Sequence, residues 1–547
     1  MLLAVLTLLI AQACVLAAHV RVSWNVGYLN ISRDGYSIWK AVGVNGTLPI
    51  APIYVDEGDI LELNVYNSLD KPISVHSHGL FFKNATYYDG AGMVTECGIP
   101  PNESFTYIID TGGQTGTFWI HGHHHSELSD GLRAPFIIRE KVPAVQYDED
   151  ILIALEDWQR MRADDLTNLQ QSVPLASLGP NNPTALINGI NGNTTQPIHF
   201  VPGRRYRLRV VSMSGTYWFK VRLPGHTLEI IEGDGTDTEP AVVDGLDLCP
   251  GQRYSVLVTA HNTDAFNYAF NVTFYSKFFN QIAGLDPRHY EIPLVYRPNA
   301  LTRKFPVVED SELTWSDDFA LVPRDKQPLL APVDRQIVLT EREHDHENGI
   351  GSADIAFGDY AYSPGLVPSL FTALTTGALA GESAVYGPQA NAFVVQHMHV
   401  VEIVLNNPNN RYHSFHMHGH AFQIVEVGPL YSPTGPKQNK TAYQRARRWP
   451  MRRDTVTLAS HSYLIVRFLA SNPGVFLAHC HQAQHVQSGM AFTVVVAPDV
   501  LQKTQRVPAK MLQLCQKLGV KTLGNAAGNQ GLNMTGLPPA IPVENNF

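Results

Sequence analysis

The sequence predicts an all-β protein built from three related β-sandwich domains, and three observations carry this prediction. At 547 residues the chain is too long for one ordinary core. Much of it alternates apolar and polar residues, with many β-branched side chains, between breaks of Gly, Pro, Asn and Asp. One pattern, a short strand, a polar break and a second alternating strand, recurs from Ile53, Ile198 and Phe393.

A second pattern joins the first and third units only. The segment GTFWIHGHHHSELSDGLRAPFIIRE (116–140) resembles PGVFLAHCHQAQHVQSGMAFTVVVAP (473–498). Stretches rich in Pro and charge near 140–148 and 300–332 suggest the boundaries between units. The expected parts are a signal peptide over 1–18, sandwich domains over 19–142, 143–305 and 306–500, and a C-terminal tail over 501–547.

The N-terminal segment predicts secretion. Residues 1–18, MLLAVLTLLIAQACVLAA, form an apolar run that ends in small residues and is shorter than the roughly 20 residues of a membrane span. Such a run is typical of a cleaved secretory signal, with a retained N-terminal anchor as the alternative. Glycosylation sequons support secretion and begin at Asn30, Asn45, Asn84, Asn102, Asn193, Asn271, Asn439 and Asn533. The polar, Pro-rich tail contains no C-terminal transmembrane helix.

Histidine is the residue type that stands out in the composition. The chain has 23 histidines, and its formal charge of −9 gives no electrostatic reason to expect a nucleic-acid partner. Four segments contain an H-x-H pair in or beside a strand-like pattern; the pairs are His76/His78, His121/His123, His416/His418 and His479/His481. Residues i and i+2 of a strand share a face at roughly 6.5 to 7 Å, so each pair can bind one metal or two adjacent metals. Eight imidazoles without a carboxylate favour copper or zinc over calcium or magnesium.

Cys480 stands between two of these histidines but belongs to a different centre. By the period of two, its side chain faces away from His479 and His481. With His413, His485 and Met490 it offers one thiolate, two imidazoles and a thioether, the ligand set of a blue-copper electron-transfer site. One tripeptide therefore connects a one-electron centre, through its middle residue, to a second centre bound by its flanking histidines.

A single H-x-H pair on a strand is more often without a metal than with one. The pairs in QHMHV (396–400) and EHDHE (343–347) lack companions at motif spacing, and we interpret both as surface features. His124, His125 and His420 extend the motifs without an evident role as ligands. Among the other cysteines, Cys97 and Cys515 lie in loop-like segments as plausible disulfide partners, and Cys249 opens a strand as a buried free thiol.

The four histidine segments resemble the copper signatures of multicopper oxidases, H-x-H-G, W-x-H-x-H, H-x-x-H-x-H and H-C-H-x3-H-x4-M. The resemblance covers essentially the mature chain and implies three cupredoxin-like Greek-key β-sandwich domains with four coppers. It assigns His413, Cys480, His485 and axial Met490 to type 1 copper. It assigns His76 and His416 to type 2 copper. It assigns the type 3 pair to His78, His121, His123, His418, His479 and His481. Asp89 matches an acid that assists oxygen reduction, and Cys97 with Cys515 matches a disulfide of many laccases.

Within that family, VVEIVLNN (400–407), WPMRRDT (449–455), SNPGVF (471–476) and LGNAAGN (523–529) resemble the fungal ferroxidases. Those enzymes oxidise ferrous iron beside an iron permease and usually carry a C-terminal membrane helix. They also place acids beside the type 1 histidines, and Asp157 is the candidate match here.

Other positions depart from the ferroxidase pattern. Asn409 stands where an acid is expected, and SKFFNQ (276–281) has none. The run 482–484 lacks the acid that often helps to deliver protons, so Glu127 or Asp130 is a substitute. Met490 replaces an apolar axial residue, and a thioether ligand lowers the redox potential.

The sequence therefore predicts a secreted or cell-surface copper oxidase that reduces O₂ to water with four single electrons. Ferrous iron is slightly favoured as substrate over a phenol, with ascorbate third. The non-enzymatic alternative is a copper-sequestering protein, which would need neither a blue-copper site nor the connection of that site to a second centre. The expected catalytic residues are Cys480, His479, His481, Asp89 and Asp157.

Overall fold

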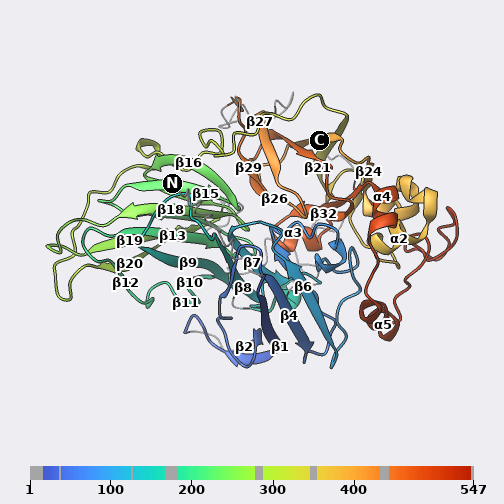
Figure 1. Cartoon of the computed structure of the whole chain (residues 1–547), viewed down its shortest axis with the longest axis horizontal. Coiled ribbons are helices and arrows are strands. Elements are labelled where there is room, and N and C mark those ends of the chain that lie inside the picture. Colours follow the sequence, from blue (N-terminus) through green and yellow to red (C-terminus); the bar gives the residue numbers. More distant parts are fainter. Residues whose placement is uncertain are drawn as a thin grey trace, which may run out of the picture.

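Three pairs of facing β-sheets, each pair from one third of the chain, form this computed structural model (Figure 1). The structure describes residues 17–35, 39–124, 127–159, 161–166, 183–276, 287–344, 354–430, 443–446 and 448–543. In Figure 1 the first sandwich is blue, the second green and the third mainly orange, and the three meet near the centre of the molecule.

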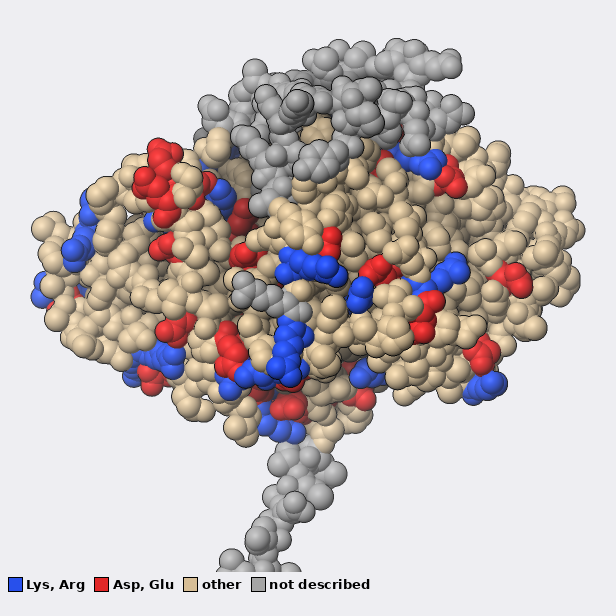
Figure 2. Space-filling view, turned by 90° about the horizontal axis from the view of Figure 1, so that it is seen from above, with Lys and Arg blue, Asp and Glu red and all other residues tan. Residues whose placement is uncertain are grey.

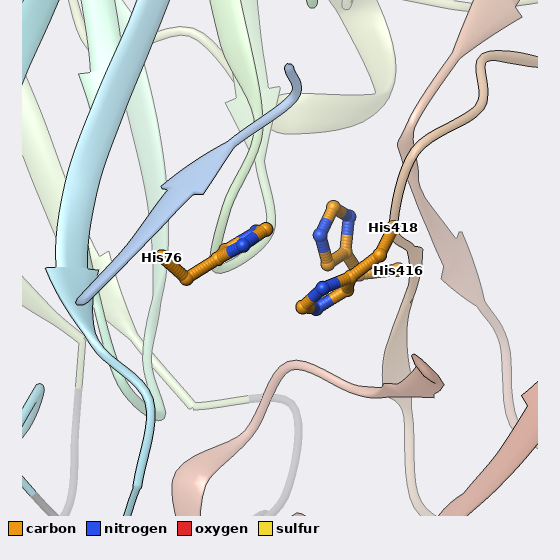
Figure 3. A group of neighbouring side chains, drawn as sticks. All are labelled: His76, His416 and His418. Carbon is orange, nitrogen blue, oxygen red and sulfur yellow. The ribbon is translucent and has the colours of Figure 1, made fainter. Parts of the chain in front are cut away.

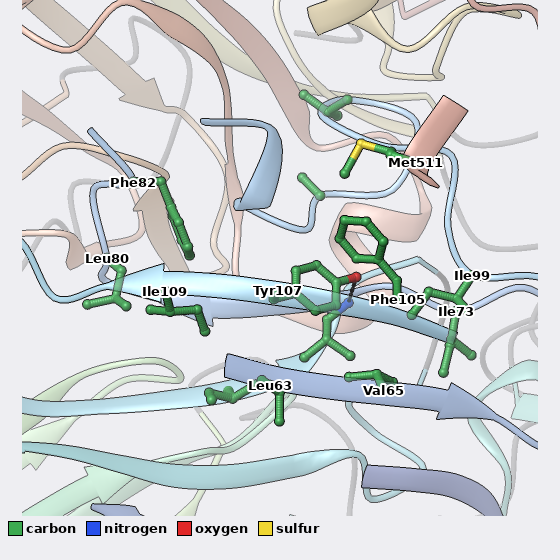
Figure 4. Close-up of a cluster of buried hydrophobic side chains, with 14 of the residues drawn as sticks. Leu63, Val65, Ile73, Leu80, Phe82, Ile99, Phe105, Tyr107, Ile109 and Met511 are labelled. Atoms are coloured by element: carbon green, nitrogen blue, oxygen red, sulfur yellow. Dashed lines mark hydrogen bonds between the residues drawn. The ribbon is translucent and has the colours of Figure 1, made fainter. Parts of the chain in front are cut away.

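The first sandwich packs a sheet of order β2-β1-β4-β6 against one of order β3-β8-β7-β5. Its strands are β1 His19–Ile31, β2 Trp39–Val44, β3 Ile53–Asp56, β4 Ile60–Asn67, β5 Val75–His78, β6 Ser104–Asp110, β7 Gly116–Gly122 and β8 Arg133–Arg139. In β4, Leu61, Leu63 and Val65 alternate with more exposed residues and are fully buried. Figure 4 shows two of them in the core of this sandwich. Each such side chain contributes roughly 1.5–3 kcal/mol through burial.

The second sandwich combines sheets of order β11-β10-β9-β13-β18-β15-β16 and β12-β20-β19-β14-β17. The strands of the first sheet are β9 Glu149–Trp158, β10 Thr184–Ile187, β11 Ile190–Asn191, β13 Arg205–Ser212, β15 Leu228–Gly233, β16 Thr236–Val243 and β18 Arg253–Thr259. Those of the second are β12 Ile198–His199, β14 Trp218–Arg222, β17 Gly245–Leu248, β19 Tyr268–Tyr275 and β20 Arg288–Val295.

The third sandwich combines sheets of order β22-β21-β25-β31-β27-β28, with β29 beside β27, and β24-β33-β32-β26-β30. The strands of the first sheet are β21 Arg335–His344, β22 Asp354–Phe357, β25 Val400–Asn407, β27 Phe422–Pro429, β28 Gln444–Arg445, β29 Arg452–Arg453 and β31 Ser462–Leu469. Those of the second are β24 Ala392–Val395, β26 His413–Met417, β30 Thr455–Leu458, β32 Gly474–Cys480 and β33 Ala491–Val496. A separate two-stranded sheet pairs β23 Tyr360–Ala361 with β34 Ile541–Pro542.

Helices are short and lie mostly at the third sandwich and its C-terminal extension, to the right in Figure 1. The α-helices that lie wholly within the described residues are α2 Ser369–Thr375, α3 Ala483–Gln487, α4 Pro498–Thr504 and α5 Ala509–Lys517. The 3₁₀ turns are η1 Thr86–Tyr88, η3 Asp310–Glu312, η4 Gly377–Gly381, η5 Ser383–Tyr386 and η6 Pro388–Ala390. None of the described helices is long and apolar enough to cross a membrane.

The pattern that recurs in the sequence marks the place where the chain passes from one sheet of a sandwich to the other. In each repeat the first strand (β3, β12 or β24) lies in one sheet, and the strand after the polar break (β4, β13 or β25) lies in the other. Both strands run parallel to a neighbour in every repeat: β3 to β8, β12 to β20, β24 to β33, and β4 to β1, β13 to β9, β25 to β21. The polar break is therefore the corner at which the chain changes layer. The domain limits given above stay predictions.

A buried arginine joins the three sandwiches. Arg253 of β18 donates to both carboxylate oxygens of Asp454, at 2.7 and 2.6 Å, and to the carbonyl oxygen of Thr117 in β7. Its side chain is fully buried, and a second ion pair with Asp234 at 3.3 Å neutralises it further. Breaking a buried pair of this kind by removing one partner typically costs 3–5 kcal/mol, so the contact fixes how the sandwiches meet.

Acidic and basic side chains are interspersed on the face shown in Figure 2, without a large patch of one sign. This distribution agrees with the modest net charge of −9. It offers no electrostatic footprint for nucleic acid on that face.

Candidate metal centres

The H-x-H pairs lie on two strands of the first sandwich and two of the third, with His123, His418 and His481 just past the ends of their strands. His76 and His78 lie on β5 and His121 on β7, and these strands are paired so that His76 is opposite His121. In the third sandwich β26 and β32 are paired so that His416 is opposite His479. Each sandwich thus presents its histidines at the ends of two neighbouring strands, on one sheet face, as the spacing of two residues predicts.

The two groups of histidines face each other across the contact between the first and third sandwiches. The ring of His76 stacks on that of His418, with centroids 3.9 Å apart, and the ring of His78 stacks on that of His416 at 3.8 Å. Figure 3 shows His76 reaching from one side toward His416 and His418 on the other. The structure therefore brings together residues that lie more than 300 positions apart in the sequence.

Backbone carbonyls fix the orientation of the rings. The Nδ1 atoms of His76 and His416 lie 2.7 and 2.8 Å from the carbonyl oxygens of Asp89 and Asp454, and that of His479 lies 2.8 Å from the carbonyl of Cys480. The Nε2 atoms of His76, His121 and His416 are buried without a hydrogen-bond partner among the described residues. Orphaned imidazole nitrogens that converge, with the opposite nitrogen bound to an oxygen, are what metal ligands require.

Burial keeps these imidazoles in the form that binds metals. It lowers the pKa of His479 to about 3, and it lowers the pKa values of His121, His418 and His481 well below 6.5, with a further contribution from neighbouring histidines. A neutral imidazole has a free lone pair for a metal ion. Metal-sized groups of nitrogens lie within 4.8 Å of one another; they are His76/His416/His418, His76/His78/His121 and His123/His418/His479.

A separate centre lies around Cys480 in the core of the third sandwich. The Sγ atom of Cys480 is 3.8 Å from Nδ1 of His413 and 3.4 Å from Nδ1 of His485. The two Nδ1 atoms are themselves 3.1 Å apart. Met490 is fully buried in the same hydrophobic core, and its carbonyl oxygen accepts from the Cys480 amide at 3.0 Å. The donor set of one thiol and two imidazoles in a dry site fits a blue copper.

The Cys480 thiol is held protonated until a metal displaces the proton. Burial raises the pKa of this thiol to about 12, and burial lowers the pKa of His413 to about 3. A metal ion that binds here therefore releases one proton from sulfur and none from the ring.

Asp89 and Asp454 orient histidines from the two sandwiches. The Oδ2 atom of Asp89 lies 2.8 Å from Nδ1 of His418, and its Oδ1 atom is buried without a hydrogen-bond partner among the described residues. Gly90 lets this loop approach β5, because a Cβ there would lie 1.9 Å from the carbonyl oxygen of Val75, at a φ of +79°. Asp89 is thus placed beside the histidine cluster, where its predicted role requires it.

Asp454 is a residue that sequence reasoning did not single out. Its Oδ1 atom is 3.0 Å from Nε2 of His78, and its carbonyl oxygen binds the ring of His416. Burial opposes ionisation, but the charge of Arg253 outweighs this effect and holds the pKa of Asp454 well below its usual value. The segment WPMRRDT contains it, yet no local spacing marks it as a partner of histidines hundreds of residues away.

A cavity of about 690 Å³ reaches the histidine cluster from outside. His121, His123, His479 and His481 line it, together with Ala483. It gives a small molecule such as oxygen a path to these rings. Ala483 stands in the run 482–484 that lacks an acid, and the carboxylate among the residues that line this cavity is that of Asp164.

The candidate acids occupy different surroundings. Asp157 is 2% exposed, and its Oδ1 accepts from Arg133 at 3.0 Å and from the Gly215 amide at 2.9 Å. Glu127 lies 3.8 Å from Lys71 Nζ. Burial raises the pKa of Asp130 to about 7, and this side chain accepts from the Ala163 amide. Asp157 therefore serves as the partner of an arginine, and its predicted role toward iron stays a prediction.

The predicted disulfide and the buried free thiol are confirmed, but Cys249 does not open a strand: it follows the end of β17, in the turn before β18. Cys97 and Cys515 form a disulfide, which ties the loop before β6 to helix α5. Cys249 is a buried free thiol whose sulfur accepts from the Ser414 hydroxyl at 3.1 Å. His420 is buried between Phe468 and Phe476. His125 and most of SKFFNQ (276–281) lie outside the described residues.

The fold and the two centres define a class of protein, an oxidase with several coppers carried by cupredoxin domains. Family models described as "Multicopper oxidase" match residues 25–143, 149–290 and 363–500. The iron multicopper oxidase fer1 of Mycosarcoma maydis is 36% identical over 94% of this chain and 86% of its own length. An iron transport multicopper oxidase of Gibberella zeae is 34% identical over 96% of this chain and 85% of its own length.

Solved structures of multicopper oxidases have a similar fold. The crystal structure of Fet3p, a multicopper oxidase that functions in iron import, has a TM-score of 0.87, 29% identity, and coverage of 96% of this chain and 99% of that chain. A laccase of Botrytis aclada has a TM-score of 0.72 at 24% identity, covers 92% of this chain and 91% of that chain, and shows the fold alone.

The chain belongs to the multicopper oxidase family. As such it is an oxidoreductase that uses copper and O₂, with one type 1, one type 2 and two type 3 coppers. The predicted family, fold class, cofactor and enzyme class are confirmed.

Proposed function

We propose that this protein is an extracellular ferroxidase, which takes single electrons from ferrous iron and passes them to O₂. The names of the relatives above, which refer to iron and iron transport, support this substrate. The apolar segment 1–18 and the sequons support secretion. Transfer of the ferric product to a membrane iron permease stays a prediction.

The ligands that we propose follow the geometry of the two centres. Type 1 copper would be held by His413, Cys480, His485 and Met490, and type 2 copper by His76 and His416. The type 3 pair would be held by His78, His121, His123, His418, His479 and His481. Copper, when bound, supplies reversible one-electron chemistry and a site for oxygen. The chain itself holds the rings in place and connects the centres, because Cys480 is bonded directly to His479 and His481.

One observation carries the choice of substrate: a buried carboxylate faces the outer edge of His413. Because Nδ1 of His413 points to Cys480, its Nε2 atom is the edge away from the type 1 centre. Glu341 of β21 is 0% exposed, and its Oε1 atom lies 3.9 Å from that Nε2. Neither atom has a hydrogen-bond partner among the described residues. The other oxygen of Glu341 accepts from the side-chain amide of Asn409.

A cation would stabilise this arrangement. Burial raises the pKa of Glu341 to about 8, since a carboxylate away from water is costly without a compensating charge. A ferrous ion supplies that charge, and a ferric ion supplies more of it, so a carboxylate here favours loss of the electron. A neutral phenol would gain no such attraction.

Glu343 continues the acidic face toward the surface. It lies two residues from Glu341, on the same face of β21, and its side chain is 17% exposed. Arg411 forms an ion pair with it. Residue 409 is where the ferroxidase pattern would have an acid beside His413. We propose that Glu341 supplies that carboxylate instead, and the side-chain amide of Asn409 donates to it.

Replacing Glu341 with Gln should raise the KM for ferrous iron about tenfold or more, since a lost charge interaction of 1.4 kcal/mol corresponds to a factor of ten. The KM for a phenolic donor should change less than about threefold, because no charge is involved. Oxygen uptake with the two donors, measured on the copper-loaded enzyme, checks both values.

Two matched variants complete this experiment. Glu402→Gln removes a carboxylate on the neighbouring strand β25 that pairs with Arg467, and it should leave the KM for iron near the parent value. Asp157→Asn tests the acid that the sequence suggested. Glu341 is not the iron site if E341Q oxidises iron with the parent KM, and iron is not the substrate if the parent itself prefers the phenol.

A further inference from the structure

A second cavity, of about 590 Å³, lies where the three sandwiches meet. All three sandwiches contribute to its wall: Phe81 and Lys83 from the segment after β5, Gly235 from the turn between β15 and β16, and His420 and Asn472 from the third sandwich. Among the described residues that line it, none is a proposed copper ligand. Its volume lies within the roughly 300–1,000 Å³ of cavities that bind small organic molecules.

Three side chains of this wall have buried hydrogen-bonding atoms without a partner among the described residues. They are Oδ1 of Asn472, Nη1 of Arg452 and Nε2 of His420. Asn472 is 3% exposed and His420 is 6% exposed. The amide nitrogen of Asn472 donates to the carbonyl oxygens of Phe81 and Gly419, at 2.6 and 3.1 Å, which fixes the orientation of its unpartnered oxygen. Buried polar atoms are rarely left without a hydrogen bond, so this group of three points to a ligand.

Basic side chains add a positive charge to the wall. The three that line the cavity are Lys83, Arg324 and Arg452. Lys83 is exposed and lies over the ring of Phe81, without an ion-pair partner in the described part of the chain. The guanidinium of Arg452 donates through Nη2 to Asp325 at 2.7 Å, which leaves Nη1 for a ligand.

The carboxylates of the wall do not cancel this charge. Asp234 is neutralised by Arg253 and Arg453, which lie outside the described lining. Asp325 and Asp237 remain against the three basic groups, and burial raises the pKa of Asp237 to about 6. The balance of charge therefore favours an anion over a cation or a neutral molecule.

We propose that this cavity binds a small organic anion that carries both carboxylate and hydroxyl groups, a hydroxycarboxylate. A carboxylate accepts charge-assisted hydrogen bonds from Arg452 and Lys83. A hydroxyl group donates to Oδ1 of Asn472, which an anion without a donor leaves unsatisfied. An occupant that contacts the first and third sandwiches together stabilises their contact, because it binds only the folded chain. The site does not include the type 1 centre, so the proposal holds whichever substrate that centre oxidises.

Isothermal titration calorimetry of the copper-loaded enzyme with L-malate tests this proposal. L-malate has two carboxylates and one hydroxyl, succinate is the same dicarboxylate without the hydroxyl, and sulfate supplies charge alone. We expect a Kd for L-malate below about 1 mM, with succinate and sulfate at least about tenfold weaker. L-malate should also raise the melting temperature, and copper analysis before and after the titration confirms that no metal is removed.

Three variants locate the site. Arg452→Gln and Lys83→Gln should each weaken the binding of L-malate at least about tenfold, and K83Q alters an exposed side chain, so it keeps the test valid if R452Q does not fold. Arg445→Gln is the matched control and should bind L-malate as the parent does, because Arg445 is exposed and pairs with Glu426 outside the cavity lining. The proposal is overturned if L-malate does not bind the parent, if succinate binds as tightly as L-malate, or if neither K83Q nor R452Q weakens binding.

Discussion

Replacing Cys480 with Ser is expected to remove the intense absorption near 600 nm and to lower kcat for every reducing substrate by at least about a thousandfold. Cys480 supplies the thiolate of the type 1 centre and the direct chain connection to His479 and His481, so both the centre and its path are lost together. Absorption spectra and steady-state oxygen uptake on the copper-loaded variant measure the two effects.

The copper bound by the histidine cluster should remain, since none of its proposed ligands changes. Cys249→Ser is the matched control, because Cys249 is the other buried free thiol in the described part of the chain and its sulfur contacts Ser414 rather than a proposed ligand. A blue band that survives in C480S, or that disappears in C249S, contradicts the assignment of the thiolate.

Replacing Asp454 with Ala is expected to destabilise the protein by about 3–5 kcal/mol, because the buried Arg253 side chain loses two carboxylate hydrogen bonds of 2.7 and 2.6 Å and keeps only the longer ion pair with Asp234 at 3.3 Å. It also releases the ring of His78 and removes a charge that fixes the position of His416. The copper content should therefore fall as well, by the 10–100-fold in affinity that is typical when a group that orients a ligand is lost. Thermal unfolding and metal analysis after dialysis check the two effects.

Asp318→Ala provides the comparison for this variant. Asp318 pairs with Arg453, whose side chain keeps two hydrogen bonds of 2.9 Å to Asp234, and it contacts none of the proposed ligands. D318A should lose clearly less stability and bind copper as the parent does. Equal copper affinity in D454A and the parent would show that Asp454 holds the sandwiches together without ordering the ligands.

The parts of the site that follow from local geometry could be predicted from the sequence. The spacing of His76 and His78, and of His479, Cys480 and His481, sets which side chains share a strand face, and the faces are as predicted. The recurring pattern at Ile53, Ile198 and Phe393 likewise predicted three related sandwiches, because each sandwich needs the same corner where the chain changes sheets.

The residues that sequence reasoning missed act across long distances. Asp454 and Arg253 lie 201 positions apart, and Glu341 lies 72 positions before His413. Their partners are set by how sheets pack, which no local spacing records. Asp157 shows the same limit: the sequence suggested a role for it, and only the structure shows that it pairs with Arg133 of the first sandwich, while its role toward iron stays a prediction.

We propose that this chain couples four one-electron oxidations of ferrous iron to the reduction of one oxygen molecule to water. The most direct test measures ferric iron formed and oxygen consumed at the same time, with catalase and a peroxide probe in parallel samples. We predict four ferric ions for each O₂ and no hydrogen peroxide above background. Two ferric ions for each O₂ with matching peroxide, or oxygen uptake from a phenol without oxidation of iron, would contradict it.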